Sequence, residues 1–321
     1  LGDVYKRQGR KTDGVMDYLL TYADRGFSGN PQDTGNDRTY SLDVLPQEFP
    51  CRLTGDFRSP VLDLVNADGS FGCDLRYQGY EICDGKYNLK GLPAVYAAEE
   101  EAQTLIIYMK DQVTGLQVEL LYGVLPEYDV ITRSAKVVNT EEDKIRLTKA
   151  QAACIDLLHG EFDVISFYGR HAMERNMQRT SVGHGAFVIG SRRGTSSHQY
   201  NPAVILAEKG TTETAGSCYG MLFVYSGNFS CEAEKDQFNQ TRLLLGLNEE
   251  LFSYPLAAGE TFTVPEVILS YSADGLSALS QQYHNCIRNH VCRSKYVHMQ
   301  RPVLILSLIH ISEPTRLRCI S

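Results

Sequence analysis

The chain has 321 residues, of which 43% are hydrophobic, and its acidic side chains outnumber the basic ones to give a formal net charge of −8 at pH 7. This length and composition are enough for one large or two ordinary domains with a buried core. The acidic balance disfavours nucleic acid or an anionic membrane surface as the main partner, and the absence of any run of eighteen apolar residues disfavours a membrane-spanning helix.

Nine cysteines are scattered along the chain without a CxxC motif, and their number is odd. This pattern argues against a disulfide framework, so we predict reduced, mostly buried thiols and a cytoplasmic protein. Two histidines and two cysteines lie close together in the sequence: His284, Cys286, His290 and Cys292. On a helix these side chains would spread around the circumference, which does not suit the tight geometry of a metal site. We therefore predict neither a metal nor another cofactor.

The first distinctive stretch is a loop-like segment, residues 23–31 (ADRGFSGNP), which leads to residues 40–50 (YSLDVLPQEFP). Glycine, proline and asparagine break regular structure here. The segment combines charged groups, such as Asp24 and Arg38, with the aromatic ring of Phe27. That combination suits a ligand with many hydroxyl groups, whereas the plainer alternative is an ordinary solvated loop.

Short strands dominate the middle of the chain. Leu116, Val118 and Leu120 alternate with polar residues, which is the period of a half-buried strand, and residues 130–138 continue this style. Further short apolar runs, separated by glycine and proline, occur between residues 186 and 271. Many short strands at this spacing predict a large antiparallel β-sandwich.

Two dipeptides, Asp68-Gly69 and Asp84-Gly85, are typical of β-hairpin turns. One helix is also predicted, beginning after Asp274-Gly275, because apolar residues recur at helical spacing. The residues of this stripe are Leu276, Leu279, Tyr283, Ile287 and Val291. Its amphipathic pattern predicts a helix that packs on the sheet.

Nine motifs occur in one order along the chain: YADRGFSGNP, DRTYSLDVLPQEFP, TGDFRSP, ITRSAKVVN, FYGRHAMERN, RRGTSSHQYNP, VYSGNF, PEVILSYS and RPVLI. Together they resemble the N-terminal β-sandwich domain of the bacterial family 36 α-galactosidases, over roughly residues 15 to 305. The resemblance implies a mainly β fold, a large supersandwich with one C-terminal linker helix. It also implies that the catalytic (β/α)8 barrel, a unit of about 250 residues, is missing from this chain.

The resemblance divides the chain into four parts. Residues 9–273 are the sandwich domain, and residues 274–305 are the helix and linker towards the barrel. Residues 1–8 (LGDVYKRQ) and 306–321 do not continue the family pattern. Both ends resemble translated sequencing-adapter read-through, so we expect them to be non-native and exclude them from fold reasoning.

Family 36 enzymes are retaining hydrolases of terminal α-linked galactose, with two catalytic aspartates on the barrel. We therefore assign no catalytic residue here and expect the chain alone to be inactive. The resemblance implies that sandwich loops contact the sugar, which would place Asp24 in the substrate site, where a carboxylate accepts hydroxyl groups. Arg38 is a second candidate, although a structural salt bridge explains it equally well. His171 is a third, at a position where some relatives carry Trp, and its ring offers less stacking area.

Two further motifs have structural alternatives. Residues 193–202 are expected mainly to satisfy backbone groups at a domain or subunit boundary. In residues 55–60 (GDFRSP), Asp56 and Arg58 are expected to pair with each other. Beyond the α-galactoside substrate, the family resemblance implies a homo-oligomer, a tetramer. The alternative function, from a different class, is a complete non-catalytic carbohydrate-binding or assembly module.

Overall fold

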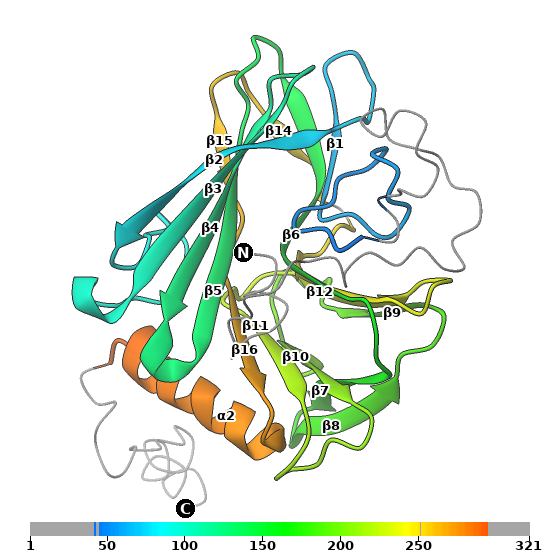
Figure 1. Ribbon diagram of the computed structural model, residues 1–321, viewed down its shortest axis with the longest axis vertical. Coiled ribbons are helices and arrows are strands. Elements are labelled where there is room, and N and C mark those ends of the chain that lie inside the picture. Colours follow the sequence, from blue (N-terminus) through cyan, green and yellow to red (C-terminus); the bar gives the residue numbers. More distant parts are fainter. Residues whose placement is uncertain (1–41, 43–44, 251, 295–321) are drawn as a thin grey trace, which may run out of the picture.

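The computed structural model describes residues 42, 45–250 and 252–294. Within these residues, antiparallel strands form two facing sheets, and the α-helix α2 (Gly275–Cys286) lies near the C-terminal end (Figure 1). Short 3-10 turns, η4 (Glu99–Glu101) and η5 (Pro126–Tyr128), and the π-helical turn η6 (Ile287–Val291) complete the elements. None of the helices in this part of the chain is long and apolar enough to cross a membrane.

The larger sheet has ten strands, and its spatial order differs from the chain order. It runs β2 (Leu75–Asp84), β3 (Gln103–Asp111), β4 (Gln117–Leu125), β5 (Val130–Val138), β16 (Val267–Ser272), β11 (Cys218–Phe223), β10 (Tyr200–Glu208), β7 (Phe162–Arg170) and β8 (Met173–Ser181), with β15 (Thr261–Thr263) also pairing with β5.

The smaller sheet has five strands and carries the longest strand of the fold. It runs β1 (Leu62–Val65), β6 (Ile145–Leu157), β13 (Thr241–Leu247) and β12 (Phe229–Lys235), with β14 (Tyr254–Leu256) also pairing with β6. The strand β9 (Gly185–Gly190) lies beside β12. Neighbouring strands within both sheets of the described chain pair antiparallel, as the sequence predicted for a sandwich.

The main core fills the space between the two sheets. Leu120 of β4 and Leu206 of β10 contribute from the larger sheet, and Leu147 of β6 and Phe229 of β12 contribute from the smaller one. All four side chains are fully buried. The predicted alternation at the start of β4 is confirmed, because Val118 and Leu120 lie in this core while Gln117 is exposed.

The helix α2 covers the opposite face of the larger sheet, as the apolar stripe predicted. Leu276 and Leu279 pack against Ile165 of β7 in a second, smaller core. Tyr283 extends this contact and donates a hydrogen bond from its hydroxyl group to the carbonyl of Ile268, at 3.2 Å. Its ring fits only because residue 220 is glycine, since a Cβ atom there would lie 2.6 Å from the ring.

Neither predicted dipeptide closes a tight β-hairpin, although the strands on either side of Asp84-Gly85 do pair. Asp68-Gly69 does form a tight turn, in which the Gly69 N–H donates to the Asn66 carbonyl at 3.0 Å. The strands on either side of it, β1 and β2, belong to different sheets. Asp84-Gly85 ends β2, and the partner strand β3 begins only after the long connection of residues 86–102. Turn chemistry therefore located both bends, but it specified neither the length of the β2–β3 connection nor that β1 and β2 belong to different sheets.

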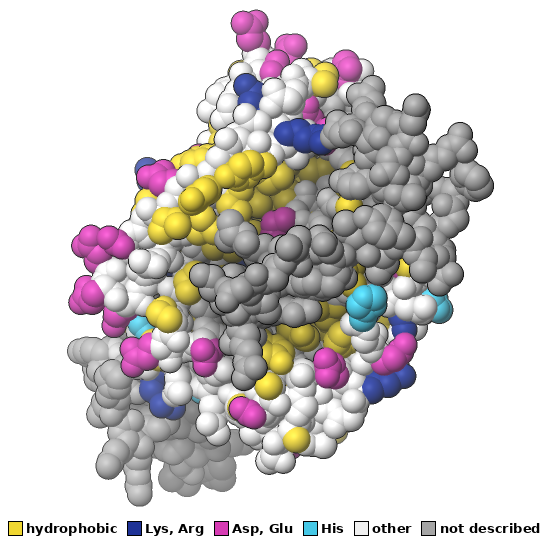
Figure 2. Space-filling model, viewed as in Figure 1, with side chains coloured by type: hydrophobic (Ala, Val, Ile, Leu, Met, Phe, Trp, Pro, Cys, Tyr) yellow, Lys and Arg dark blue, Asp and Glu magenta, His cyan; other side chains and the backbone are white. Residues whose placement is uncertain are grey.

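The β2 edge of the larger sheet carries an exposed apolar face, defined by Tyr77, Tyr80 and Ile82. These side chains are about 60% exposed, although they share the core-facing side with the apolar residues of β3. A β-bulge between Tyr77 and Gly79 keeps both tyrosines on that side. Figure 2 shows a band of hydrophobic side chains over this region of the molecule.

Buried thiols should make the fold sensitive to alkaline pH. All cysteines in the described part of the chain are free thiols. Burial raises the pKa of Cys218 to about 11 and that of Cys286 to about 12, against an ordinary value of 9.0 in the unfolded chain. Because the unfolded state releases these protons first, the stabilisation is complete below pH 9 and is lost as pH rises towards 11 and 12.

We therefore expect the urea midpoint of unfolding to fall between about pH 8 and pH 10. The fall should be smaller for Cys286→Ala, which removes one of the titrating groups. Equal pH profiles for the two proteins would contradict a contribution from this thiol.

Candidate functional site

Of the three predicted substrate contacts, His171 is described by the structure, whereas Asp24 and Arg38 lie outside the described residues. His171 stands at the tip of the hairpin that joins β7 to β8, and its side chain is exposed. The strand β8 is the outer edge of the larger sheet. The hairpin therefore presents His171 to solvent rather than to the core.

The backbone of this hairpin tip is irregular. The pairing of β7 with β8 shifts register between Tyr168 and Arg170, because two residues of β8, Glu174 and Arg175, lie opposite the single residue Gly169, which is a β-bulge in β8. A Cβ atom on Gly169 would lie 2.4 Å from the Met173 carbonyl oxygen, so only glycine fits there. Ala172 has a φ of 64°, in the left-handed region. Bulges and such strained residues are frequent beside binding sites.

A carboxylate is held beside His171. Glu174 accepts a hydrogen bond from the Ala172 N–H at 2.9 Å. Backbone hydrogen bonds from Glu174 and Ala172 lower the pKa of the Glu174 carboxyl, against the opposing effect of burial, and His171 and His198 lower it further. The hairpin tip thus offers an ionised acceptor next to imidazole rings, which suits hydrogen bonds to hydroxyl groups.

The motif of residues 193–202 lies against the same hairpin. The Gly169 N–H donates to the Gln199 carbonyl at 3.1 Å, and Tyr200 of β10 lies opposite Tyr168 of β7. Both tyrosines remain partly exposed, at 38% and 43%. From the sequence we expected a structural role for this motif, and we did not identify Tyr168 or Tyr200 as candidate site residues. Their proximity depends on the pairing of β7 with β10, which no local sequence pattern specifies.

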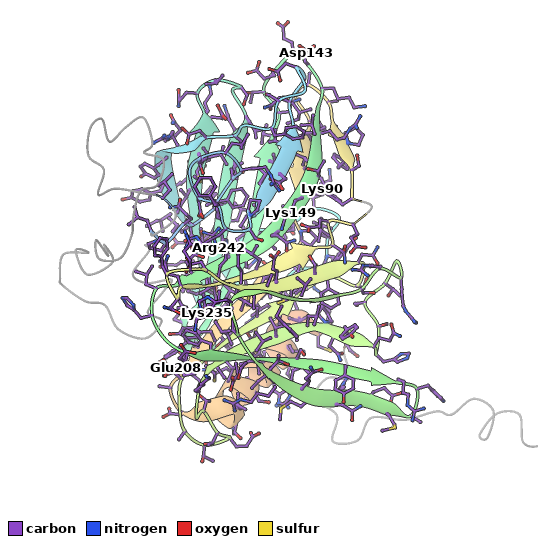
Figure 3. All side chains as sticks on the ribbon, turned by 90° about the vertical axis from the view of Figure 1, so that its right-hand side faces the viewer. Lys90, Asp143, Lys149, Glu208, Lys235 and Arg242 are labelled. Atoms are coloured by element: carbon purple, nitrogen blue, oxygen red, sulfur yellow. The ribbon has the colours of Figure 1, made fainter. Side chains whose placement is uncertain are left out.

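The GDFRSP segment confirms the predicted local ion pair and extends it. Arg58 donates from Nε to Asp56 at 2.9 Å. The Arg242 guanidinium, from β13, donates to Asp56 at 2.7 Å and to both oxygens of Asp156, from β6, at 2.7 and 2.8 Å. These four charged side chains, the buried quartet, are each at most 5% exposed. Figure 3 places Arg242 at the middle of the molecule, below Lys149.

The buried quartet also holds the segment that precedes it. Arg58 donates to the carbonyls of Leu42 at 3.2 Å and Leu45 at 2.7 Å, and the Gln47 N–H donates to Asp156 at 2.9 Å. With two positive and two negative groups, the quartet is balanced in charge. Buried ions need such pairing, because an isolated charge in the interior is costly.

The two histidines and two cysteines that lie close together in the sequence, residues 284–292, do not form a metal site in the structure. His284 is exposed, and Cys286 is buried against Val95 and Ile268. His290 is buried and uses Nδ1 in a hydrogen bond with the Tyr96 carbonyl at 2.8 Å. Among the described residues, no group of three or more His, Cys, Asp or Glu side chains is arranged to hold a metal ion.

Comparison with known proteins agrees with the fold described above. Residues 13–257 match the glycosyl hydrolase family 36 N-terminal domain, and residues 261–310 match Melibiase. The chain belongs to glycosyl hydrolase family 36. The bifunctional alpha-galactosidase/sucrose kinase AgaSK of Mediterraneibacter gnavus is 73% identical over 299 residues, covering 93% of this chain and 32% of that protein.

Solved structures of family 36 proteins superpose well on this sandwich. The galactosidase domain of AgaSK has a TM-score of 0.89 at 73% identity, over 92% of this chain and 41% of that one. The alpha-galactosidase AgaA of Geobacillus stearothermophilus, solved with stachyose, has a TM-score of 0.87 at 39% identity over the same shares. The chain thus spans about a third to two fifths of the length of these relatives. Its described residues contain no (β/α)8 barrel.

Proposed function

We propose that this chain is the N-terminal domain of a retaining α-galactosidase, which hydrolyses terminal α-D-galactosyl residues of galacto-oligosaccharides. The observation that carries the proposal is the 73% identity with an alpha-galactosidase over 93% of this chain. In this proposal the sandwich supplies substrate-binding loops and oligomer contacts, while the catalytic carboxylates belong to a barrel. A retaining glycosidase needs two such carboxylates about 5 Å apart.

The proposal gives Asp24, Arg38 and His171 the role of substrate contacts. For His171, its exposure at a bulged hairpin tip and the neighbouring Glu174 carboxylate support that role. A homotetramer, as in the family, and a cytoplasmic location are further parts of the proposal. The free thiols of the described cysteines are compatible with a reducing compartment.

A chimeric enzyme tests the proposed function. Residues 13–294 of this chain would replace the matching region in the galactosidase domain of AgaSK, and hydrolysis of p-nitrophenyl α-galactoside would be measured. We expect a folded, active chimera, and no hydrolysis by the 321-residue chain alone. A chimera that folds and assembles but does not hydrolyse the substrate would contradict the proposal. It would favour a carbohydrate-binding or assembly module instead.

Within an active chimera, His171→Ala should raise KM for raffinose about two- to tenfold, with little change in kcat. The reason is that an aromatic contact to the bound sugar contributes about 0.5–1.5 kcal/mol. His171→Trp should lower KM, because the larger ring offers more stacking area. His159→Ala, an exposed histidine on a different loop, is the matched control. An unchanged KM in a folded His171→Ala protein would remove this residue from the site.

A further inference from the structure

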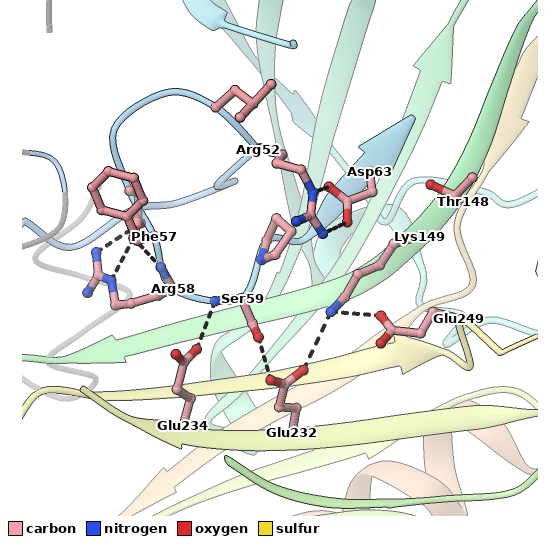
Figure 4. A pocket seen from close by; sticks show the side chains of 13 residues that line it. Arg52, Phe57, Arg58, Ser59, Asp63, Thr148, Lys149, Glu232, Glu234 and Glu249 are labelled. Atoms are coloured by element: carbon pink, nitrogen blue, oxygen red, sulfur yellow. Dashed lines mark hydrogen bonds and ion pairs between the residues drawn. The ribbon is translucent and has the colours of Figure 1, made fainter. Parts of the chain in front are cut away.

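A pocket of about 590 Å³ opens between the GDFRSP segment and the outer side of the smaller sheet (Figure 4). Asp63 of β1 and Lys149 of β6 are cross-strand partners on its wall. Glu232 and Glu234 reach it from β12, and Glu249 reaches it from the loop after β13. A volume of this size is within the range of small-molecule sites.

A nearly buried ammonium group lines the pocket and, among the contacts of the described residues, keeps hydrogen-bonding capacity. The Lys149 side chain is 7% exposed, and its Nζ lies 2.8 Å from Glu249 and 3.5 Å from Glu232. An ammonium group has three donors, so these two contacts leave one donor for a ligand. Arg52, which pairs with Asp63 through two of its nitrogens, likewise keeps further N–H groups at the rim.

The acidic wall has unused acceptors. Glu234 accepts a hydrogen bond from the Ser59 N–H at 2.8 Å, and Glu232 accepts one from the Ser59 hydroxyl group. A carboxylate has about four acceptor positions on its two oxygens. Each of these side chains can therefore accept additional hydrogen bonds without losing those it already makes.

Apolar side chains stand at the mouth of the same pocket. Phe57 is 78% exposed and Leu53 is 72% exposed, and both belong to the lining. An exposed aromatic ring beside charged donors and acceptors is the combination that binds the apolar face and the hydroxyl groups of a sugar together.

The charges of the lining decide between classes of ligand. Its ionisable residues are three bases, Arg52, Arg58 and Lys149, and five acids, Asp56, Asp63, Glu232, Glu234 and Glu249. The acidic excess disfavours an anion. A cation would compete with Arg52 for Asp63 and with Lys149 for Glu249 and Glu232, and it would leave the Lys149 and Arg52 donors unused. A neutral hydroxyl group both donates and accepts hydrogen bonds. It can therefore accept from Lys149 and donate to Glu232 or Glu234 without breaking an ion pair.

We propose that this pocket, lined by Phe57, Lys149, Glu232 and Glu234, is a binding site for a neutral oligosaccharide. Phe57 contacts the apolar face of a sugar ring, Glu232 and Glu234 accept hydrogen bonds from its hydroxyl groups, and Lys149 donates to a sugar oxygen. Binding here needs no catalytic group, so it is independent of the proposed hydrolysis.

The test is a titration of the 321-residue chain with raffinose, in which binding is measured by ligand-observed saturation-transfer NMR. The parent protein for all titrations carries Asp24→Ala, Arg38→Ala and His171→Ala, which removes the substrate contacts of the proposed function. Glu234→Gln keeps an acceptor for the Ser59 N–H but loses the charge. We expect it to weaken binding about tenfold, as the loss of a charged hydrogen bond does. Phe57→Ala should weaken binding to a similar degree.

Two exposed residues outside the pocket provide matched controls, Glu127→Gln and Phe71→Ala, and neither should change the affinity. Circular dichroism verifies that each variant is folded. The proposal is overturned by an absence of raffinose binding up to its solubility limit, or by pocket variants that bind as well as the parent. Spermidine serves as the cationic probe. Binding of spermidine in place of raffinose would also overturn the proposal.

Discussion

Replacing Arg242 by Met is expected to lower the free energy of unfolding by about 3–5 kcal/mol, the cost of leaving buried charges without their partner. The Arg242 side chain is fully buried and donates to Asp56, Asp156 and the Ser59 carbonyl at 2.7–2.9 Å. Burial lowers its pKa, but the carboxylates of Asp156 and Asp56 outweigh burial and hold the pKa well above its ordinary value. The guanidinium is therefore charged at every accessible pH.

Without Arg242, Arg58 would be the remaining base of the buried quartet for its two carboxylates. The segment that Arg58 binds through the Leu42 and Leu45 carbonyls should loosen together with the GDFRSP segment. Arg242→Lys keeps the charge but loses the planar fork that contacts both aspartates, so we expect an intermediate loss of stability.

Urea unfolding followed by circular dichroism measures these changes. The matched control is Arg52→Met, because Arg52 also pairs with an aspartate, Asp63, but is 54% exposed. An exposed pair of this kind contributes less than about 1 kcal/mol. If the Arg52 and Arg242 variants lose the same stability, the buried quartet does not have the structural role assigned to it.

The buried quartet also shows how far sequence reasoning reaches in this protein. The pair of Asp56 and Arg58 was predictable because the two residues are two positions apart in a loop. Asp156 and Asp56 are 86 and 186 residues away from Arg242. Those contacts exist because β6 and β13 pair in a register that places Arg242 opposite Asp156. No local pattern contains that register.

The same limit explains the errors about turns and the success with strands. Alternation along β4 and the apolar stripe of α2 are local properties of the chain, and both were predicted correctly. Whether the turn at Asp68-Gly69 joins partners depends instead on the choice of β6 as the partner of β1. The sandwich was therefore predictable from many short strands, while the order of its strands became visible only in the structure.

The candidate site, too, was predictable only where a local motif identified its residues. His171 was identified through a motif shared with the family and not through its own chemistry, because a lone exposed histidine has no distinguishing pattern. The neighbouring Tyr168 and Tyr200 became visible only once β7 and β10 were paired. The pocket beside Phe57 depends on β1, β6 and β12 together, so its residues are scattered through the sequence.

Replacing Glu266 by Gln should cost about 3 kcal/mol of unfolding free energy, because it leaves the Lys86 ammonium group buried without an anion. Lys86 Nζ lies 2.5 Å from Glu266 Oε1, and the two side chains are 1% and 0% exposed. The other carboxylate oxygen accepts the Val95 N–H at 2.7 Å, which ties the connection between β2 and β3 to the sheet. Glutamine preserves the shape of the side chain and this second hydrogen bond. The loss of unfolding free energy therefore measures mainly the effect of removing the negative charge.

The pH dependence of that loss distinguishes a buried charge from a packing defect. Burial lowers the pKa of Lys86 below its ordinary value of 10.5, although Glu266 opposes this shift. Removing the carboxylate should lower the pKa further. The unfolded chain then binds a proton that the folded variant releases, so the variant gains stability relative to the original protein as pH rises towards 10.5.

The difference in unfolding free energy between the two proteins should therefore narrow from about pH 7 to about pH 9.5. Both proteins carry Cys286→Ala in this comparison, because Glu266 raises the pKa of the Cys286 thiol and its removal would change that titration too. The alkaline loss caused by Cys218, whose pKa is raised by burial alone, is shared by the two proteins and cancels. The double variant Lys86→Met with Glu266→Gln should recover much of the stability, since no buried charge remains. A constant difference across this pH range, with no recovery in the double variant, would mean that packing rather than charge pairing explains the loss.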